Sequence, residues 1–361
     1  MGVEAHSLRL HGLVVAMLAN FCWVELDQPG PSGASRLLCT RRSRLGKSGQ
    51  TIAVGDRVWV EGIDWPQGRG VIGGRGPRDG LLERPAVANV ARVMVVVALA
   101  EPALDPLQLT RFLLTAEATG RPVQLVFSKA DLVPAATAEH WCQRARAWGY
   151  EALAVSCRTG EGLERLSQRL SQPGIAVLCG PSGVGKTSLL NGLSPGLGLR
   201  VAAVSGRLQR GRHTTRHVEL FALAPGALMA DTPGFNRPEL PREATDLGPL
   251  FPEIRRFLEL GRCRFNDCLH LGDPGCAVGV DWERYPLYTQ CLADLAEEPG
   301  RQAKGPKRPE QPGAHRLARA LRQPSRRSAR QQVLNGESID PAEGDSEWQS
   351  GAELSPPGRA D

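Results

Sequence analysis

Residues 180–187, in the middle of the chain, have the types and spacing of a phosphate-binding loop. They read G-P-S-G-V-G-K-T and follow the apolar run 175–179. A strand, a turn of inward-facing N–H groups and a helix N-terminus would surround an anion here, with Lys186 on the outer phosphates and the Thr187 hydroxyl on Mg²⁺. A chance Gly/Ser loop is the alternative, which the complete motif disfavours. The predicted nucleotide contacts in this stretch are Gly180, Pro181, Ser182, Gly183, Val184, Gly185, Lys186, Thr187 and Ser188.

Two polar stretches at predicted strand ends could read a purine base. Ser128-Lys129-Ala130-Asp131 follows the apolar run 122–127, and the stretch S-C-R-T-G, which begins with Ser156 and Cys157, follows the run 151–155. The Asp131 carboxylate can accept from the ring N–H and amine of guanine, which adenine does not offer, while the Lys129 stem lies on the base. Backbone N–H groups of the second stretch could meet the guanine carbonyl. Alone, Lys-x-Asp is also a common helix cap or surface pair.

An aspartate at the end of an apolar hairpin is a further candidate ligand for Mg²⁺. Asp231 begins the stretch D-T-P-G after the predicted strands 217–223 and 227–230. Such an Asp holds Mg²⁺ through water, and the following glycine N–H senses the γ-phosphate. A plain strand-to-loop turn is the alternative. The polar segment 206–215, which contains His213 and ends in Thr214 and Thr215, precedes this hairpin.

Three thiols and an imidazole are crowded into residues 263–276. Cys263, Cys268, His270 and Cys276 match the ligand set of a closed Cys₃His structural zinc site. Disulfides are disfavoured in a reducing compartment, and free buried cysteines would not need this crowding. With four protein ligands the metal has no open position, so its predicted role is to fold a segment too small to bury a core.

The elements around these motifs indicate an α/β fold with additions at both ends. Short strands broken by Gly and Pro predict a small antiparallel, OB-like β-barrel over residues 1–85. Long apolar strands alternating with amphipathic helices predict a doubly wound sheet over residues 86–240. A helical zinc module over 241–298 and a disordered tail over 299–361 would complete the chain. A basic loop with Arg41, Arg42, Arg44 and Lys47 is either a nucleic-acid contact of the barrel or a solvated loop.

Composition limits the remaining choices. The net charge is +6 and the isoelectric point is near 9.0, which permits a polyanionic partner without requiring one. The sequence shows no uninterrupted apolar run of membrane length and no signal-peptide pattern at its start, so we expect no membrane contact and a cytoplasmic location. The remaining cysteines are scattered through apolar segments and are predicted to be buried reduced thiols.

Together the motifs resemble the circularly permuted GTPase family called ribosome small subunit-dependent GTPase A, or RsgA/YjeQ. Ordinary GTPases carry the phosphate loop first and the guanine-reading motifs last, whereas here residues 128–131 and 156–160 precede residues 180–187, 211–215 and 231–234. The resemblance spans roughly residues 8–295. It implies a circularly permuted P-loop GTPase domain between an RNA-binding barrel and a zinc module, with one structural Zn²⁺ per chain and Mg²⁺ held with GTP by Thr187, Thr214, Thr215 and Asp231.

The function implied by this resemblance is late assembly of the small ribosomal subunit. The implied reaction is hydrolysis of GTP to GDP and phosphate, stimulated by the ribosome, and the implied partners are the small subunit and its rRNA, with the chain as a monomer. Lys186 is the predicted catalytic contact to the phosphates. His213 is the candidate for orienting water, because Phe235 occupies the position where Ras-like enzymes carry Gln, and a solvated loop histidine is the alternative.

One motif departs from the family pattern. The family carries Asn where this chain has Ser128, and that Asn ties the base-reading loop to the phosphate loop. The shorter serine puts nucleotide affinity, more than guanine preference, in question.

Two other functions compete with an assembly GTPase. A P-loop ATPase or kinase would leave Asp131 and the permuted order unexplained, and an RNA-binding scaffold that holds nucleotide with little turnover would explain Phe235. The permuted order also predicts that nucleotide state controls the spacing of barrel and zinc module, because residue 234 leads directly into that module.

Overall fold

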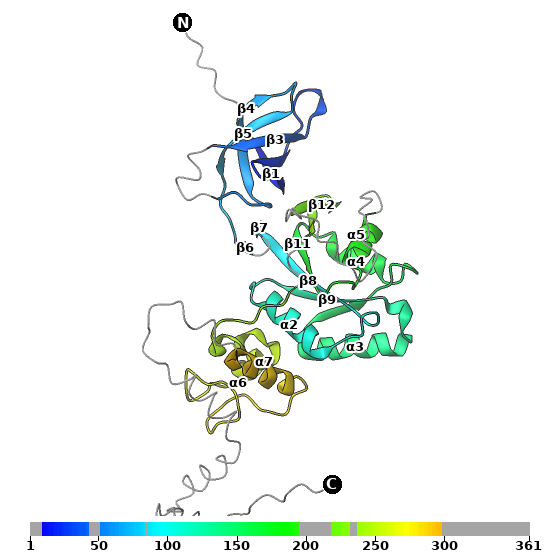
Figure 1. The fold of residues 1–361 in the computed structure, drawn as a ribbon, viewed down its shortest axis with the longest axis vertical. Helices are drawn as coiled ribbons and strands as arrows, with labels where there is room; N and C mark the ends of the chain where they lie inside the picture. The colour runs from blue at the N-terminus through cyan, green and yellow to red at the C-terminus, as the bar shows by residue number, and fades with distance from the viewer. Residues whose placement is uncertain (1–8, 43–50, 84–85, 195–217, 232–236, 298–361) are drawn as a thin grey trace, which may run out of the picture.

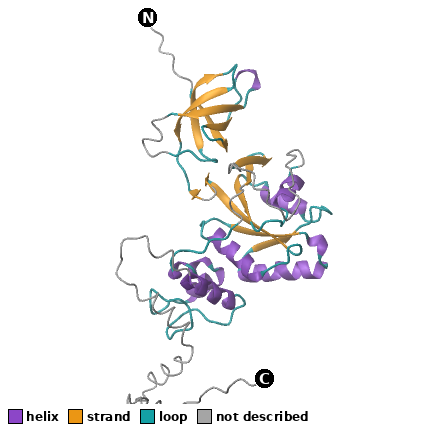
Figure 2. Ribbon diagram, in the orientation of Figure 1, coloured by secondary structure: helices purple, strands orange, loops and turns teal. Residues whose placement is uncertain are grey.

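The chain folds into three regions that follow one another along its longest axis (Figure 1). The structure is a computed structural model that describes residues 9–42, 51–83, 86–194, 218–231 and 237–297, without the side chains of residues 32 and 231. Strands form the first region, strands covered by helices the second, and short helices the third (Figure 2). Over this part of the chain, every helix falls short of the length and apolarity needed to cross a bilayer.

The first region is a closed five-stranded barrel, which confirms the predicted OB-like architecture. Its strands run in the order β1-β2-β3-β5-β4, and β4 pairs with β1 to close it. One pair, β3 with β5, is parallel, so the expectation of an entirely antiparallel barrel was wrong. Alternate residues of each strand point into a core that includes Val24, Leu37 and Val60. The strands are β1 (Leu10–Met17), β2 (Phe21–Leu26), β3 (Arg36–Arg41), β4 (Arg57–Asp64) and β5 (Arg69–Arg75), with a 3-10 turn η1 (Pro31–Gly33).

Strand β5 carries little strand signal in the sequence, because it is rich in glycine, which weakens any strand pattern. The fold explains the glycines. A Cβ atom on Gly74 would lie 1.9 Å from the Trp59 ring, and one on Gly73 would lie 2.5 Å from the Glu61 carboxylate. The indole of Trp59 therefore packs closely against β5 because neither glycine carries a side chain.

The second region is the predicted α/β sheet. The strand order β10-β9-β8-β11-β13-β12 is parallel except for the last strand, which pairs antiparallel with β13. Helices α2 and α3 lie on one side of the sheet, and α4 and α5 on the other (Figure 1). The elements are β8 (Val90–Ala98), α2 (Pro106–Glu117), β9 (Val123–Ser128), η2 (Ala130–Leu132), α3 (Ala135–Trp148), β10 (Glu151–Ala154), α4 (Leu163–Leu170), β11 (Gly174–Cys179), α5 (Lys186–Leu193), β12 (Glu219–Ala224) and β13 (Ala227–Asp231).

Burial on both faces explains the long apolar runs. In β8, Val93, Val95 and Val97 face α2 and α3, whereas Met94 and Val96 face α4 and α5. Successive side chains of a strand point to opposite faces, so a strand covered on both sides must be apolar at every position. All parallel strands therefore end at one edge, where the polar motifs follow them.

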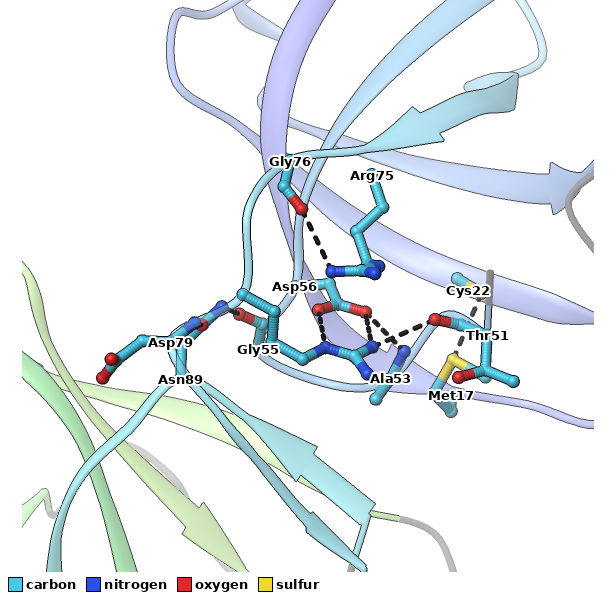
Figure 3. Close-up of polar contacts among 11 residues, drawn as sticks. Met17, Cys22, Thr51, Ala53, Gly55, Asp56, Arg75, Gly76, Asp79 and Asn89 are labelled. Atoms are coloured by element: carbon cyan, nitrogen blue, oxygen red, sulfur yellow. Dashed lines mark hydrogen bonds and ion pairs between the residues drawn. The ribbon is translucent and has the colours of Figure 1, made fainter. Parts of the chain in front are cut away.

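A polar junction attaches the barrel to the sheet (Figure 3). The buried Asp56 carboxylate accepts from Arg78 Nε at 2.8 Å and Nη2 at 2.6 Å, and from the Ala53 N–H at 2.8 Å. Asn89 donates from Nδ2 to the Gly55 carbonyl oxygen at 2.8 Å. The short hairpin of β6 (Leu81–Glu83) and β7 (Ala86–Ala88) lies between the barrel and β8.

The barrel also touches the sheet's antiparallel edge strand. Ala16 of β1 pairs with Glu219 of β12, and the Glu219 carboxylate forms an ion pair with Arg36 at 3.2 Å. Val15 and Val54 of the barrel belong to the same core cluster as the strands of the sheet. Barrel and sheet therefore share apolar packing as well as the polar junction.

The third region is a small helical unit held on α2 and α3. It contains η4 (Ala244–Asp246), η5 (Gly248–Leu250), α6 (Pro252–Leu260) and α7 (Tyr285–Glu297), packed on Leu114 of α2. The guanidinium of Arg284 is fully buried and donates to both oxygens of Glu253, at 2.7 and 2.6 Å. It also lies 4.9 Å from the Trp148 ring centroid and 5.4 Å from that of Tyr150. One arginine therefore joins the unit to the end of α3.

Candidate nucleotide and metal sites

The phosphate loop runs from the end of β11 to the start of α5. Gly180, Gly183 and Gly185 all have positive φ angles, at 144°, 81° and 89°. A Cβ atom on Gly180 would lie 2.0 Å from the Val96 carbonyl oxygen, so only glycine fits there. The Lys186 ammonium donates to the carbonyl oxygens of Gly180 at 2.9 Å and Pro181 at 2.7 Å. The Lys186 side chain therefore folds back onto the first two residues of its own loop, which places its positive charge beside the loop backbone.

The predicted base-reading loop, residues 128–131, is tied to the phosphate loop by a buried hydroxyl. Ser128, the last residue of β9, donates from Oγ toward the Val184 carbonyl oxygen at 2.6 Å, and the Val97 carbonyl oxygen lies 3.1 Å from the same atom. A hydroxyl carries one proton, so the shorter contact to Val184 is the stronger one. Because Val184 sits inside the phosphate loop, the tie that the family forms with Asn is made here by Ser128.

Asp131 is held by two donors from residues 156–160, the second stretch predicted to read the base. Its Oδ1 accepts from the Ser156 hydroxyl at 2.5 Å, and its Oδ2 accepts from Arg158 Nε at 2.7 Å. These bonds hold the pKa of the Asp131 carboxyl below its usual range, and the bond from Ser156 has the larger effect. The carboxylate is therefore ionised at neutral pH, as an acceptor for two guanine donors must be.

The Ser156 hydroxyl also organises its own turn. Its oxygen accepts from the backbone N–H groups of Arg158 at 3.2 Å and Thr159 at 3.1 Å, so its proton is left for Asp131. Within the described residues, the Cys157 N–H has no acceptor, and it is the amide of this turn that could meet a guanine carbonyl. Lys129 adopts a left-handed conformation, and its ammonium donates to the Glu101 carbonyl oxygen.

The predicted Mg²⁺ ligands are placed in part. Thr187 is the second residue of α5, and Asp231 ends β13, whose Ala230 pairs with Val177 of β11. The Asp231 backbone therefore ends beside the strand that leads into the phosphate loop. His213, Thr214 and Thr215, and the residues 232–234 after Asp231, lie outside the described residues.

The four predicted zinc ligands converge on one point. Their ligand atoms all lie within 4.8 Å of one another. His270 Nδ1 is 3.6 Å from Cys263 Sγ and 3.7 Å from Cys276 Sγ, and the two sulfurs are 4.0 Å apart. A tetrahedron with metal–sulfur bonds of about 2.3 Å has edges of about 3.8 Å, so the geometry fits a tetrahedral ion.

The chemistry around this Cys₃His cluster also fits a cation. Burial raises the pKa of the Cys268 thiol to about 12 and raises that of Cys276, so three thiolates there need a compensating positive charge. Burial lowers the pKa of His270, which favours the neutral ring that binds metals. The Ala277 N–H lies 3.4 Å from Cys263 Sγ and would stabilise its thiolate.

The basic rim of the barrel is partly engaged within the protein. Arg41 donates to the Ala19 carbonyl oxygen at 3.1 Å, and Arg42 forms an ion pair with Glu61 at 2.7 Å. Arg44 and Lys47 lie outside the described residues. Two contacts near the nucleotide site were not predicted from the sequence. These are the acceptor role of the Val184 carbonyl and the bond from Arg158 to Asp131, for which neither residue carries a local signal.

Comparison with known sequences gives a consistent family. Residues 75–241 match the family model described as RsgA GTPase. The chain is 57% identical over 286 residues to the small ribosomal subunit biogenesis GTPase RsgA of Parasynechococcus marenigrum, covering 79% of this chain and 96% of that protein. It is 48% identical over 305 residues to the protein of the same name from Trichormus variabilis, covering 79% of this chain and 82% of that protein.

Two solved structures share the fold. YjeQ from Thermotoga maritima is 30% identical with a TM-score of 0.65, over 80% of this chain and 99% of that one. YloQ, a circularly permuted GTPase, is 27% identical with a TM-score of 0.65, over 85% of this chain and 100% of that one. The permuted order of motifs seen here is therefore shared with a solved structure.

Proposed function

Because the chain belongs to the RsgA GTPase family, we propose that it is a GTP hydrolase that acts in biogenesis of the small ribosomal subunit. The observation that carries this proposal is the bond from Ser128 Oγ to the Val184 carbonyl oxygen. It joins the strand end that bears Asp131 to the loop that bears Lys186, so base and phosphate contacts belong to one site. A P-loop ATPase or kinase would have no use for the ionised Asp131.

The residues divide the work of the reaction. The N–H groups of the phosphate loop and the Lys186 ammonium bind the phosphates and would stabilise the charge that develops as the terminal phosphoryl group leaves. Asp131 accepts the two guanine donors, and Ser156 keeps it oriented and ionised. Thr187 and Asp231 would hold Mg²⁺, which when bound would neutralise charge on the outer phosphates. His213, Thr214 and Thr215 remain proposed contacts from the sequence.

The parts on either side of this site serve the partner. The barrel and the helical unit that contains the Cys₃His cluster would contact rRNA, and basic side chains of the barrel would meet its phosphates. One zinc ion per chain at Cys263, Cys268, His270 and Cys276 would fix the helical unit, with no open position for catalysis. Action as a monomer in the cytoplasm and the boundaries 1–85, 86–240 and 241–298 belong to the same proposal. The tail predicted over 299–361 lies outside the described residues.

The decisive experiment measures nucleotide specificity and turnover. We expect the purified protein to bind GDP and GTP with Mg²⁺ and to exclude ADP and ATP, and to hydrolyse GTP faster when small ribosomal subunits are added. Asp131→Asn should shift preference toward xanthine nucleotides, whose ring offers an acceptor where guanine has a donor. Lys186→Ala should remove turnover. Equal binding of ATP and GTP would overturn the guanine assignment.

A scaffold that holds nucleotide with little turnover is the second candidate. Phe235 favours it, because an apolar ring cannot orient the attacking water. Guanine binding without turnover, with small subunits present or absent, would support the scaffold over the GTPase.

A further inference from the structure

The contact between Arg158 and Asp131 has a consequence for nucleotide binding. Asp131 is the predicted guanine-reading carboxylate, and its side chain is only 9% exposed. Arg158 donates from Nε to Oδ2 at 2.7 Å, while Ser156 donates to Oδ1 at 2.5 Å. Both oxygens of the base-reading group are therefore already bonded to donors of the protein itself.

The two donors differ in how they would respond to a base. The Ser156 hydroxyl is buried and is fixed by the N–H groups of Arg158 and Thr159, so it stays in place. Each carboxylate oxygen has two lone-pair positions, and Oδ1 can accept from a base while it keeps Ser156. The Arg158 side chain is 73% exposed and can swing into solvent. Arg158 is thus the donor that can leave.

Arginine and guanine present the same chemical fragment to a carboxylate. The Watson–Crick edge of guanine is a planar H–N–C–N–H unit formed by N1, C2 and N2, and the Nε edge of a guanidinium is the same unit. Adenine has a ring acceptor at the corresponding N1 position and cannot replace it. A guanine base placed against Asp131 needs the lone pairs and the space that Arg158 takes.

We propose that Arg158 is an affinity- and specificity-determining residue that acts as a built-in guanine surrogate. It occupies Asp131 when no nucleotide is bound, and guanine must displace it. The inference rests on the proposed function, since it concerns the base-reading part of the same site. The displaced contact is with the base and not with a phosphate, so it weakens GDP and GTP binding equally.

The test compares nucleotide affinities of the full chain by isothermal titration calorimetry. Arg158→Ala should bind GDP and a non-hydrolysable GTP analogue about two- to fivefold more tightly than the wild type, the range expected for an exposed ion pair. Arg158→Lys, which keeps the charge and loses the planar fork, should tighten binding similarly. Removal of a positive charge ordinarily weakens binding of an anionic nucleotide, so the expected sign is opposite to a general charge effect.

Arg165→Ala is the matched control. Arg165 is an exposed residue of α4 that makes no contact with Asp131, and its loss changes the net charge by the same amount. Its affinities should equal or fall slightly below those of the wild type. Unchanged or weaker binding by Arg158→Ala would overturn the surrogate role while leaving the GTPase proposal intact. Failure of the wild type to bind any guanine nucleotide would overturn both.

Discussion

The Ser128 hydroxyl lies 2.6 Å from the Val184 carbonyl oxygen, across 56 residues of sequence. Both groups are buried, so no water substitutes for the bond. The strand end that presents Asp131 and the loop that presents Lys186 are therefore held at a fixed spacing, although the permuted chain order separates them.

Ser128→Ala should weaken binding of GDP and GTP about tenfold, because it leaves the buried Val184 carbonyl without its donor. Ser128→Asn, whose amide can donate to the same oxygen, should retain most of the affinity. The measurement is calorimetric titration with both nucleotides. Ser167→Ala, on the exposed face of α4, is the control. Wild-type affinity in Ser128→Ala would show that packing alone holds the two loops together.

The pH dependence of guanine binding should reflect the lowered pKa of Asp131. A carboxyl whose pKa is depressed in the folded state keeps its charge as the pH falls through the usual carboxyl range, and it loses that charge only below it. GDP affinity should therefore hold through mildly acid pH. Ser156→Ala removes the main cause of the shift, so its loss of GDP affinity should begin at higher pH. An unchanged onset would contradict this assignment.

Cys268→Ser should abolish binding of one zinc ion per chain, because a tetrahedral site with three ligands holds the metal far less tightly. Metal analysis gives the zinc content, and hydrogen exchange should show lost protection in α6 and α7 with the sheet intact. Cys142→Ser, at a buried thiol of α3 outside the cluster, should retain the metal. A fully protected α6 and α7 without zinc would exclude a structural metal.

Glu253→Ala should destabilise the attachment of the helical unit by about 3–5 kcal/mol, because it leaves the buried Arg284 charge unpaired. The exposed pair of Glu139 with Arg146 offers a contrast, and Glu139→Ala should leave the free energy of unfolding nearly unchanged, because solvent screens that pair. Urea unfolding measures the loss of stability in each variant, and hydrogen exchange in α6 and α7 shows whether the loss is confined to the helical unit. Similar losses in the two variants would mean that the Arg284 pair is not what holds the unit.

Affinity for the small ribosomal subunit should be high with a non-hydrolysable GTP analogue, lower with GDP, and lower again as salt screens phosphate contacts. The barrel contacts β12 through Glu219, a few residues after the predicted Mg²⁺ ligands Thr214 and Thr215, so a change there can reach the barrel. Sedimentation with purified subunits provides the measurement. Removal of the barrel is a poor test, because Val15 and Val54 pack in the core of the sheet. Equal affinity in both nucleotide states would exclude this coupling.

Short-range patterns determined much of this protein from its sequence. The phosphate loop is one contiguous stretch, and the four predicted zinc ligands lie within residues 263–276, so spacing alone led to both predictions. The apolar runs of the parallel strands were visible because burial on both faces demands them. Strand β5 had no such apolar run, because its glycines leave room for the Trp59 side chain on the neighbouring strand β4.

Tertiary structure decided the contacts that join these parts. The bond from Ser128 to Val184, the surrogate position of Arg158 on Asp131, and the burial of Arg284 between α3 and the helical unit each link residues distant in the chain. Such contacts depend on which surfaces the packed core brings together. A local sequence pattern does not specify which distant segments will be neighbours. Ser128 stands where the family pattern has asparagine, so the sequence alone did not show whether the two loops are joined. The fold shows the bond, because the Val184 carbonyl oxygen lies 2.6 Å from the Ser128 hydroxyl.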